Sequence, residues 1–371
     1  MNILINTANI SGGGGAQVAD SICRYLNEYS EHKFIVVLSK ALDNTAEAIS
    51  DYPNVIIERY NCKAGDIKSL ITFRNKCLDK YVEKYNIECV FTVFGPIKWR
   101  PKCTHICGFG LSHIVMPESP FFQKMSLMER VKWTRTIKIW EYIFGRSSDM
   151  LITENPLISK RLQNLFKKKK IVTITNNYNQ VFDNPSQQKC RKLPSFNGTS
   201  FLDVTAFGPH KNTTIAIKIA AILKEKYPSF KCRFVFTFER DRFPDIPTEL
   251  NDYFYFTGRI GIEECPSLYD QCDVEFQPTL LECFTATYPE AMRMEKPIVT
   301  VDLPFAHGLC GDAALYYSPL SADAAADCLY KVATDINVKE KLVEAGKIQL
   351  QSFDTSRERA DKVIKLCEKV K

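Results

Sequence analysis

The sequence predicts an α/β protein of two domains, each a parallel sheet covered by helices, which face a cleft. Three observations lead to this prediction. The chain has 371 residues, too many for one ordinary core. Short apolar segments alternate with amphipathic helical segments along most of its length. The alternation stops at an irregular stretch rich in Asn, Pro, Ser and Gln, residues 176–200, and then restarts.

The elements of the first half follow from short apolar segments and helical periodicity. We expect strands at residues 2–7, 34–39, 89–95, 105–110 and 149–155, and helices at 16–29, 67–85 and 121–146. Strands alternating with helices in this way form a parallel sheet with helices on its faces.

The second half repeats the same arrangement. We expect strands at 201–207, 232–238, 253–258, 273–278 and 297–302, and helices at 212–226, 264–271, 289–295, 322–335, 338–350 and 355–370. The predicted boundaries are a Rossmann-like domain at 1–180, a linker at 181–200, a second Rossmann-like domain at 201–354, and a last helix, 355–371, that packs back on the first domain.

Composition and charge narrow the class of protein. Hydrophobic residues make up 45% and charged residues 25%, which is the globular range, and no apolar run reaches the length of a membrane span. The start has no features of a signal peptide, so the 14 cysteines are expected to be reduced in a cytoplasmic protein. Residues 1–190 carry 26 Lys+Arg and 17 Asp+Glu. This excess of cations predicts an anionic partner, phosphates or a membrane surface, and solvated lysine-rich helices are an equal alternative.

A run of four glycines, Gly12 to Gly15, lies between the first predicted strand and its helix. Glycines there allow a ligand to approach the backbone at a helix N-terminus, where anions are favoured. The dinucleotide fingerprint fails, because Gln17 stands where its last glycine belongs and no acid follows the second strand. A nicotinamide oxidoreductase is therefore disfavoured, and a flexible turn remains the alternative.

Lys211 occupies the corresponding place in the second half, with Asn212 or Thr213 as the expected helix cap. A lysine at a helix N-terminus opposes the helix dipole unless an anion lies between them. Lys211 is thus a candidate ligand of a diphosphate, and a solvated loop lysine is the alternative.

Two acids, Glu282 and Glu290, flank the start of a helix in "LLECFTATYPEAMRMEKPIV". Glu290 has a structural explanation, a capping box with Thr287 as N-cap and Pro289 in the first turn. Glu282 has none, and it follows a predicted strand at the place where α/β sheets bind ligands.

These acids resemble the E-x7-E signature of the retaining GT-B glycosyltransferases of family 4, also called glycosyl transferases group 1. The segments "GGAQ", "HKN", "FTGRI" and "GDAALYYSPLSADAAA" are similar to other motifs of that family, and in the same order. The resemblance is dense over residues 200–335 and sparse over 1–180. It implies a GT-B fold and metal-independent transfer of a hexose-like sugar from a nucleotide sugar to an acceptor hydroxyl.

The resemblance also implies the site residues. The catalytic residues would be Glu282, Lys211 and His113, the last in a first-domain loop that carries a functional histidine in some members. The donor would be bound by these residues: Glu290, Gly14, Gly15, Gln17, Arg259, Ile260, Phe284, Thr285 and Ala286. The chain departs from the family at Ala206, where an arginine often stands, and at Cys283 and Thr285, which replace glycines. A non-catalytic sugar-nucleotide-binding protein of the same fold is therefore kept as the alternative.

The expected partners are a nucleotide-sugar donor and a glycan or lipid-linked acceptor in glycan, polysaccharide or glycolipid biosynthesis, with no nucleic acid. No cofactor or metal is expected, because Cys103, His105 and Cys107 offer fewer than the four ligands zinc prefers. Residues 129–146 carry an apolar stripe of Trp133, Ile137, Trp140 and Phe144 flanked by cations. This stripe predicts packing on the sheet or, as the alternative, peripheral contact with the inner face of a membrane.

Overall fold

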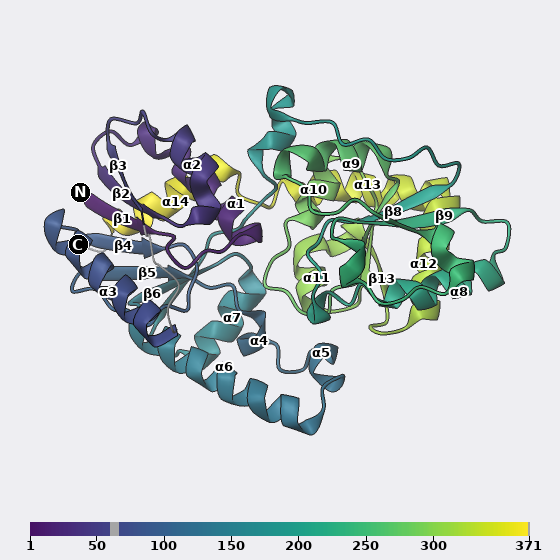
Figure 1. Cartoon of the computed structure of the whole chain (residues 1–371), viewed down its shortest axis with the longest axis horizontal. Coiled ribbons are helices and arrows are strands. Elements are labelled where there is room, and N and C mark those ends of the chain that lie inside the picture. The colour runs from purple at the N-terminus through teal and green to yellow at the C-terminus, as the bar shows by residue number, and fades with distance from the viewer. Residues whose placement is uncertain (60–66, 370–371) are drawn as a thin grey trace. The chain divides into compact units, whose positions relative to one another are not determined.

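The computed structural model describes the backbone of residues 1–59 and 67–369, and the side chains of the same ranges except 67–74. The described chain divides into two compact units. Unit 1 comprises residues 1–115, 126–176 and 354–371, and unit 2 comprises 116–125 and 177–353. We describe each unit by itself (Figure 1).

Unit 1 is built on a parallel sheet that has seven strands within the described residues, in the order β3-β2-β1-β4-β5-β6-β7. The strands are β1 (Asn2–Asn6), β2 (Lys33–Leu38), β3 (Val55–Arg59), β4 (Cys89–Thr92), β5 (Thr104–Gly108), β6 (Met150–Thr153) and β7 (Lys170–Thr173). The apolar run Phe34–Leu38 of β2 is fully buried, as expected for a strand covered on both faces.

Helices cover both faces of this sheet. They are α1 (Gly13–Cys23), α2 (Asp43–Ala48), α3 (Ile67–Lys84), α4 (Ser112–Val115), α6 (Leu127–Ser147), α7 (Pro156–Leu165) and α14 (Ser356–Glu368). One core cluster joins strand residues to apolar side chains of α1 and α14, and another joins the opposite strand faces to Leu78 of α3 and Trp99. The C-terminal helix α14, yellow in Figure 1, therefore packs beside the purple α1 at the start of the chain.

Unit 2 has a parallel sheet of six strands in its described residues, ordered β10-β9-β8-β11-β12-β13. The strands are β8 (Thr199–Asp203), β9 (Cys232–Phe236), β10 (Phe254–Phe256), β11 (Val274–Gln277), β12 (Ile298–Val301) and β13 (Ala314–Tyr317). The helices are α5 (Pro120–Gln123), α8 (Ile215–Lys226), α9 (Cys265–Gln271), α10 (Thr287–Arg293), α11 (Pro304–Cys310), α12 (Ala322–Thr334) and α13 (Ile336–Leu350). In its core the Phe234 ring of β9 lies 5.3 Å from the Phe201 ring of β8 and 5.5 Å from the Phe276 ring of β11, measured between ring centroids.

The sheet order reverses direction between β8 and β11 in unit 2 and between β1 and β4 in unit 1. Loops at the carboxyl ends of strands next to such a switch point are where open α/β sheets bind ligands. The predicted α/β class with two Rossmann-like domains is confirmed, and these loops are the places to look for the site.

Candidate functional site

Lys211 and Glu282 come together at the carboxyl ends of β8 and β11. The Lys211 Nζ donates to the Glu282 Oε1, and Thr279 Oγ1 donates to the same oxygen over 3.4 Å. Both side chains are largely buried but keep a solvent-exposed part. The two residues lie in loops 71 positions apart in the sequence, so the fold brings together two of the three predicted catalytic residues.

The two loops are joined by their backbones. Leu280 N donates to His210 O over 2.8 Å, and Thr279 Oγ1 lies 3.3 Å from the same carbonyl, an alternative acceptor for its one hydrogen. Asn212 adopts a left-handed conformation with φ 54°, and its Nδ2 donates to Pro278 O over 3.4 Å. These bonds hold Lys211 opposite Glu282.

The expected helix cap after Lys211 is wrong. Residues 209–211 form a 3₁₀ turn, α8 begins at Ile215, and its N-cap Thr214 makes no side-chain capping bond. The reason is that Asn212 adopts a left-handed conformation, and its side-chain amide donates to the Pro278 carbonyl of the neighbouring loop instead of capping the helix. Lys211 therefore precedes the helix by a turn and is directed to Glu282.

Residues 116–125 belong to unit 2, although the sequence predicted that they belong to the first domain. Ser119 Oγ donates to Leu280 O over 2.6 Å, next to Glu282, and Lys124 Nζ donates to Asn212 Oδ1 over 2.5 Å, next to Lys211. The sequence analysis placed all of this segment in the first domain and residues 121–125 in the long helix 121–146. Pro117 and Pro120 were the signal that could have separated it, because proline ends or starts helices.

Asp203, at the end of β8, is a second residue that the sequence reading missed. It is buried, and within the described residues neither carboxylate oxygen has a hydrogen-bond partner. Burial raises the pKa of Asp203 to about 8, while Lys211 lowers that pKa and Glu282 raises it. Asp203 is thus a largely protonated acid in electrostatic contact with the Lys211–Glu282 pair. An acid inside the apolar run "FLDV" was the signal for it.

Glu290 lies in the first turn of α10 and is only 2% exposed. The capping box is wrong, because α10 begins at Thr287, after Ala286, and no side chain caps it. Thr287 instead accepts from Gln277 Nε2 over 3.0 Å, and Tyr269 OH donates to Glu290 Oε2 over 3.3 Å. Burial raises the pKa of Glu290 to about 7, and the Tyr269 hydrogen bond opposes that shift. A buried acid with no capping role needs another explanation.

The loop that precedes α10 contains the predicted donor residues Phe284, Thr285 and Ala286. The Phe284 ring packs edge-on against Phe353 with 5.8 Å between centroids, and Thr285 Oγ1 lies 3.2 Å from Thr287 Oγ1. This short loop, residues 283–286, connects Glu282 to the helix that carries Glu290.

Arg259 and Ile260 follow the edge strand β10. Gly258 has φ +71°, and a Cβ there would lie 2.9 Å from a Glu239 carboxylate oxygen, so the turn requires glycine. Arg259 N donates to Glu239 Oε1 over 3.2 Å, and the Arg259 side chain is exposed. No hydrogen bond or ion pair joins this loop to Lys211 or Glu282 within the part of unit 2 that the structure describes.

The other predicted residues lie in unit 1. Gly14, Gly15 and Gln17 occupy the start of α1, which begins at Gly13, three residues before the predicted start. His113 lies in α4, and its ring stacks on Trp133 of α6 with 4.5 Å between centroids and 1° between planes. They are thus in a different unit from the Lys211–Glu282 pair.

The stripe of α6 predicted from the sequence points into unit 1. Phe144 is fully buried and contacts Phe109 with 4.9 Å between centroids, and Trp140 meets Trp133 edge-on. This packing supports the predicted contact with the sheet for Phe144, while Trp133, Ile137 and Trp140 are half-buried. Within the described residues, no helix is long and apolar enough to cross a membrane.

His105, which lies between Cys103 and Cys107 in the sequence, has protein partners for both ring nitrogens. His105 is buried, and its ring nitrogens contact Thr92 Oγ1 and Ser147 O at 2.8 and 2.5 Å. Burial lowers the pKa of His105 to about 4. Among the described side chains, the three that place possible metal-ligand atoms within 4.8 Å of one another are elsewhere in unit 1: Glu31, His32 and Glu368.

The chain is similar to known proteins in part of its sequence and in its fold. Residues 191–349 match the sequence model of the family described as glycosyl transferases group 1. No match is found among the curated proteins. Sucrose-phosphate synthase from Thermosynechococcus elongatus has 16% identity and a TM-score of 0.72, with 99% of this chain and 98% of that chain covered.

Two further solved structures are similar over nearly their whole length. WaaG, a glycosyltransferase involved in lipopolysaccharide biosynthesis, has 12% identity and a TM-score of 0.70, with 99% of each chain covered. HepE of Anabaena, solved with UDP-glucose, has 14% identity and a TM-score of 0.68, with 98% of this chain and 99% of that chain covered. The chain therefore has the two-domain GT-B fold, and its residues 191–349 are similar in sequence to the glycosyl transferases group 1 family.

Proposed function

We propose that this chain is a retaining glycosyltransferase that moves a sugar from a nucleotide-sugar donor to an acceptor hydroxyl. The observation that carries the proposal is the Lys211–Glu282 contact in unit 2, one short loop away from the buried Glu290, which has no capping role. Sequence similarity to the glycosyl transferases group 1 family supports the same activity. The roles of the single residues are predictions.

In this mechanism the bond between the anomeric carbon and the donor diphosphate breaks, and the nucleoside diphosphate leaves. Lys211 and the backbone amides of 284–286 would stabilise the charge that develops on the diphosphate. The acceptor oxygen bonds to the anomeric carbon on the same face, and its proton passes to a diphosphate oxygen. Glu282 would bind a sugar hydroxyl, and the ionised Glu290 would accept hydrogen bonds from the ribose hydroxyls.

A uridine nucleotide is the first donor to test, because HepE was solved with UDP-glucose. We propose that the acceptor is a glycan or a lipid-linked sugar, that the product belongs to polysaccharide or glycolipid biosynthesis, and that the protein acts in the cytoplasm at the inner face of a membrane. The similarity to WaaG and the basic first half of the chain support this context. We further propose that transfer needs neither a metal nor a cofactor.

Glu290→Gln tests the donor site. The amide keeps the size of the side chain but loses the charge that strengthens bonds to hydroxyls, so UDP affinity should fall about tenfold, or about 1.4 kcal/mol. Calorimetry measures the affinity, and Glu249→Gln on the exposed surface of unit 2 is the matched control. Equal UDP affinity in Glu290→Gln and wild type would refute the proposed donor site. UDP binding without transfer to any acceptor or to water would instead favour a non-catalytic binding protein.

A further inference from the structure

Helix α6 has large apolar side chains on two opposite faces. Its inner stripe packs on unit 1, as described above. A second set points outward, with 47% to 83% of each side chain exposed: Leu127, Met128, Val131, Ile139 and Tyr142. Val131 and Tyr142, like Met128 and Ile139, are about three turns apart, so these side chains lie on one face of the helix. A set of large apolar side chains exposed together on one helix face indicates an interaction surface.

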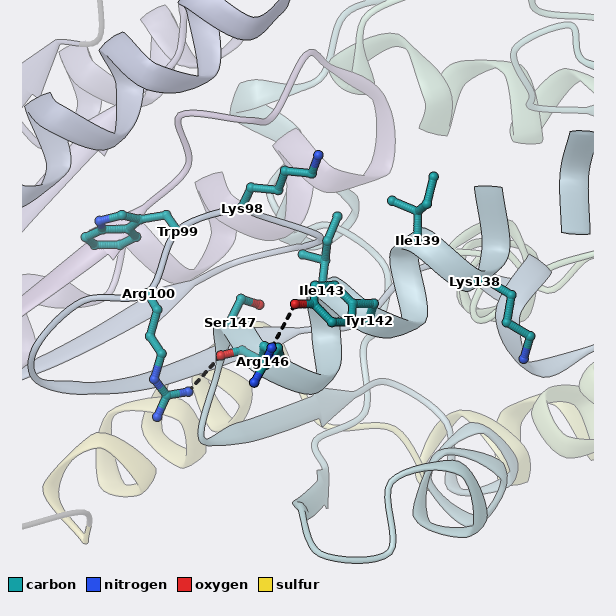
Figure 2. Close-up of a pocket in the computed structure, with 9 residues that line it drawn as sticks. All are labelled: Lys98, Trp99, Arg100, Lys138, Ile139, Tyr142, Ile143, Arg146 and Ser147. Atoms are coloured by element: carbon teal, nitrogen blue, oxygen red, sulfur yellow. Dashed lines mark hydrogen bonds between the residues drawn. The ribbon is translucent and has the colours of Figure 1, made fainter. Parts of the chain in front are cut away.

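A groove continues this outer face at the C-terminal half of α6 (Figure 2). Its volume is about 580 Å³, within the range of ligand pockets, and Trp99, Ile139, Tyr142 and Ile143 contribute its apolar wall. Arg100 Nη1 donates to the Arg146 carbonyl over 2.9 Å, which fixes the loop of Trp99 against the helix. All residues of the groove belong to unit 1.

Cations surround the groove. Figure 2 shows Lys98, Arg100, Lys138 and Arg146 around the apolar side chains. Lys138 and Arg100 form ion pairs with Glu141 and Asp149. Arg146 donates to Tyr142 OH over 2.8 Å, and neither it nor Lys98 has an acidic partner among the side chains that the structure describes. The net charge of the rim is therefore positive and suits an anionic ligand.

We infer that the outer face of α6 and its groove dock on a bilayer surface of anionic phospholipids. The exposed apolar side chains and the groove would take up acyl-chain surface, and Lys98 and Arg146 would bind lipid phosphates. Cations interspersed with large apolar side chains on one helix face are the pattern of interfacial helices. A protein partner would use the apolar stripe but does not by itself explain the unpaired cations of the rim.

This inference deepens the proposed function, since it places the membrane contact on the face of α6 opposite to the stripe that the sequence indicated. It rests on unit 1 alone, whereas the donor site rests on unit 2. Lipid binding and UDP binding can therefore be measured separately on the same protein.

Sedimentation with lipid vesicles tests the inference on the full chain. Wild type should sediment with phosphatidylcholine vesicles that contain phosphatidylglycerol, and salt should release it. Ile139→Gln should weaken this partition about fivefold or more, whereas Ile348→Gln, which changes a 65% exposed isoleucine of α13 in unit 2, should not. Lys98→Gln should weaken it about fivefold, and Lys341→Gln should leave it unchanged.

Equal binding to vesicles with and without phosphatidylglycerol would overturn the inference. So would a loss of vesicle binding in the controls Ile348→Gln and Lys341→Gln as large as that in Ile139→Gln and Lys98→Gln. A concentration-dependent dimer that Ile139→Gln dissociates, with no vesicle binding, would assign the face to a second copy of the chain instead. Melting temperature and UDP affinity should be the same in Ile139→Gln and wild type. If wild type binds vesicles but no nucleotide, the proposed donor site fails while the lipid contact stands.

Discussion

At the scale of single residues, Glu290 combines full burial with an acidic side chain. Burial raises its pKa from 4.5 to about 7, so the folded protein binds this proton more tightly than the unfolded chain. Its contribution to stability is therefore highest below about pH 4.5 and falls as the pH rises to about 7. Above that range Glu290 is ionised and buried, and no described side chain forms an ion pair with it. A ribose could stabilise this state by donating hydrogen bonds.

Glu290→Gln should remove this pH dependence. Because the amide stays neutral, its free energy of unfolding relative to wild type should increase between about pH 5 and about pH 8, by at most about 3 kcal/mol. Urea denaturation of both proteins at the two pH values measures the difference. Glu249→Gln should show no such change, and a constant difference for Glu290→Gln would mean that Glu290 is already ionised at the lower pH.

The Lys211–Glu282 pair gives a second prediction at this scale. Removing either charge leaves the other half-buried and unpaired, so Lys211→Met and Glu282→Gln should each destabilise the protein, and their effects should not add. A double-mutant cycle should give a coupling energy of about 1–3 kcal/mol. A coupling near zero would show that the contact contributes nothing to the folded state.

The same variants separate the two roles in catalysis. With Glu282 neutral, Lys211 is released for the diphosphate, so Glu282→Gln should keep or raise UDP affinity while lowering turnover. Lys211→Met should lower both. A loss of UDP affinity in Glu282→Gln as large as that in Lys211→Met would contradict a sugar-binding role for Glu282.

At the scale of elements, the C-terminal helix α14 packs closely against α1, which lies at the other end of the sequence. Its Ala360, Val363 and Ile364 are buried in the core cluster that α1 also lines. Arg359 is buried as well, and its guanidinium contacts Ser21 Oγ and lies 4.0 Å from Glu154 Oε1. The helix is thus part of the core of unit 1.

Ile364→Ala should therefore destabilise the protein by about 2–4 kcal/mol, the cost of a cavity in a packed core. Lys365→Ala, one position along the same helix and exposed, should cost no more than about 0.5 kcal/mol. Chemical denaturation followed by circular dichroism measures both. A loss as small as that of Lys365→Ala would place α14 outside the core.

At the scale of the whole molecule, the sequence predicted the class of fold well, because periodicity and glycine or proline punctuation are local signals. It missed β3, β7 and β13, which are short or only partly apolar. It also missed that residues 116–125 join unit 2, since that depends on contacts such as Ser119 with Leu280, 161 positions away. The motif order predicted that Lys211 and Glu282 belong to one site, but their ion pair and the burial of Asp203 and Glu290 are properties of tertiary packing.

Metal independence is a prediction for the complete enzyme. The proposed site meets the diphosphate with Lys211 and backbone amides, so EDTA should leave the transfer rate nearly unchanged. The measurement is turnover of the UDP-sugar donor with and without the chelator. A loss of rate that manganese restores would show that a divalent cation supplies part of the charge on the diphosphate.

The path of the chain between the units has a consequence for biosynthesis. The chain passes from one unit to the other at 115/116, 125/126, 176/177 and 353/354. On the ribosome, unit 2 is complete before residues 354–368 emerge, whereas unit 1 must wait for α14 to cover the apolar surface of α1 and β1. The domain translated first is thus the one finished last, and nascent chains lacking α14 should be the species that chaperones bind.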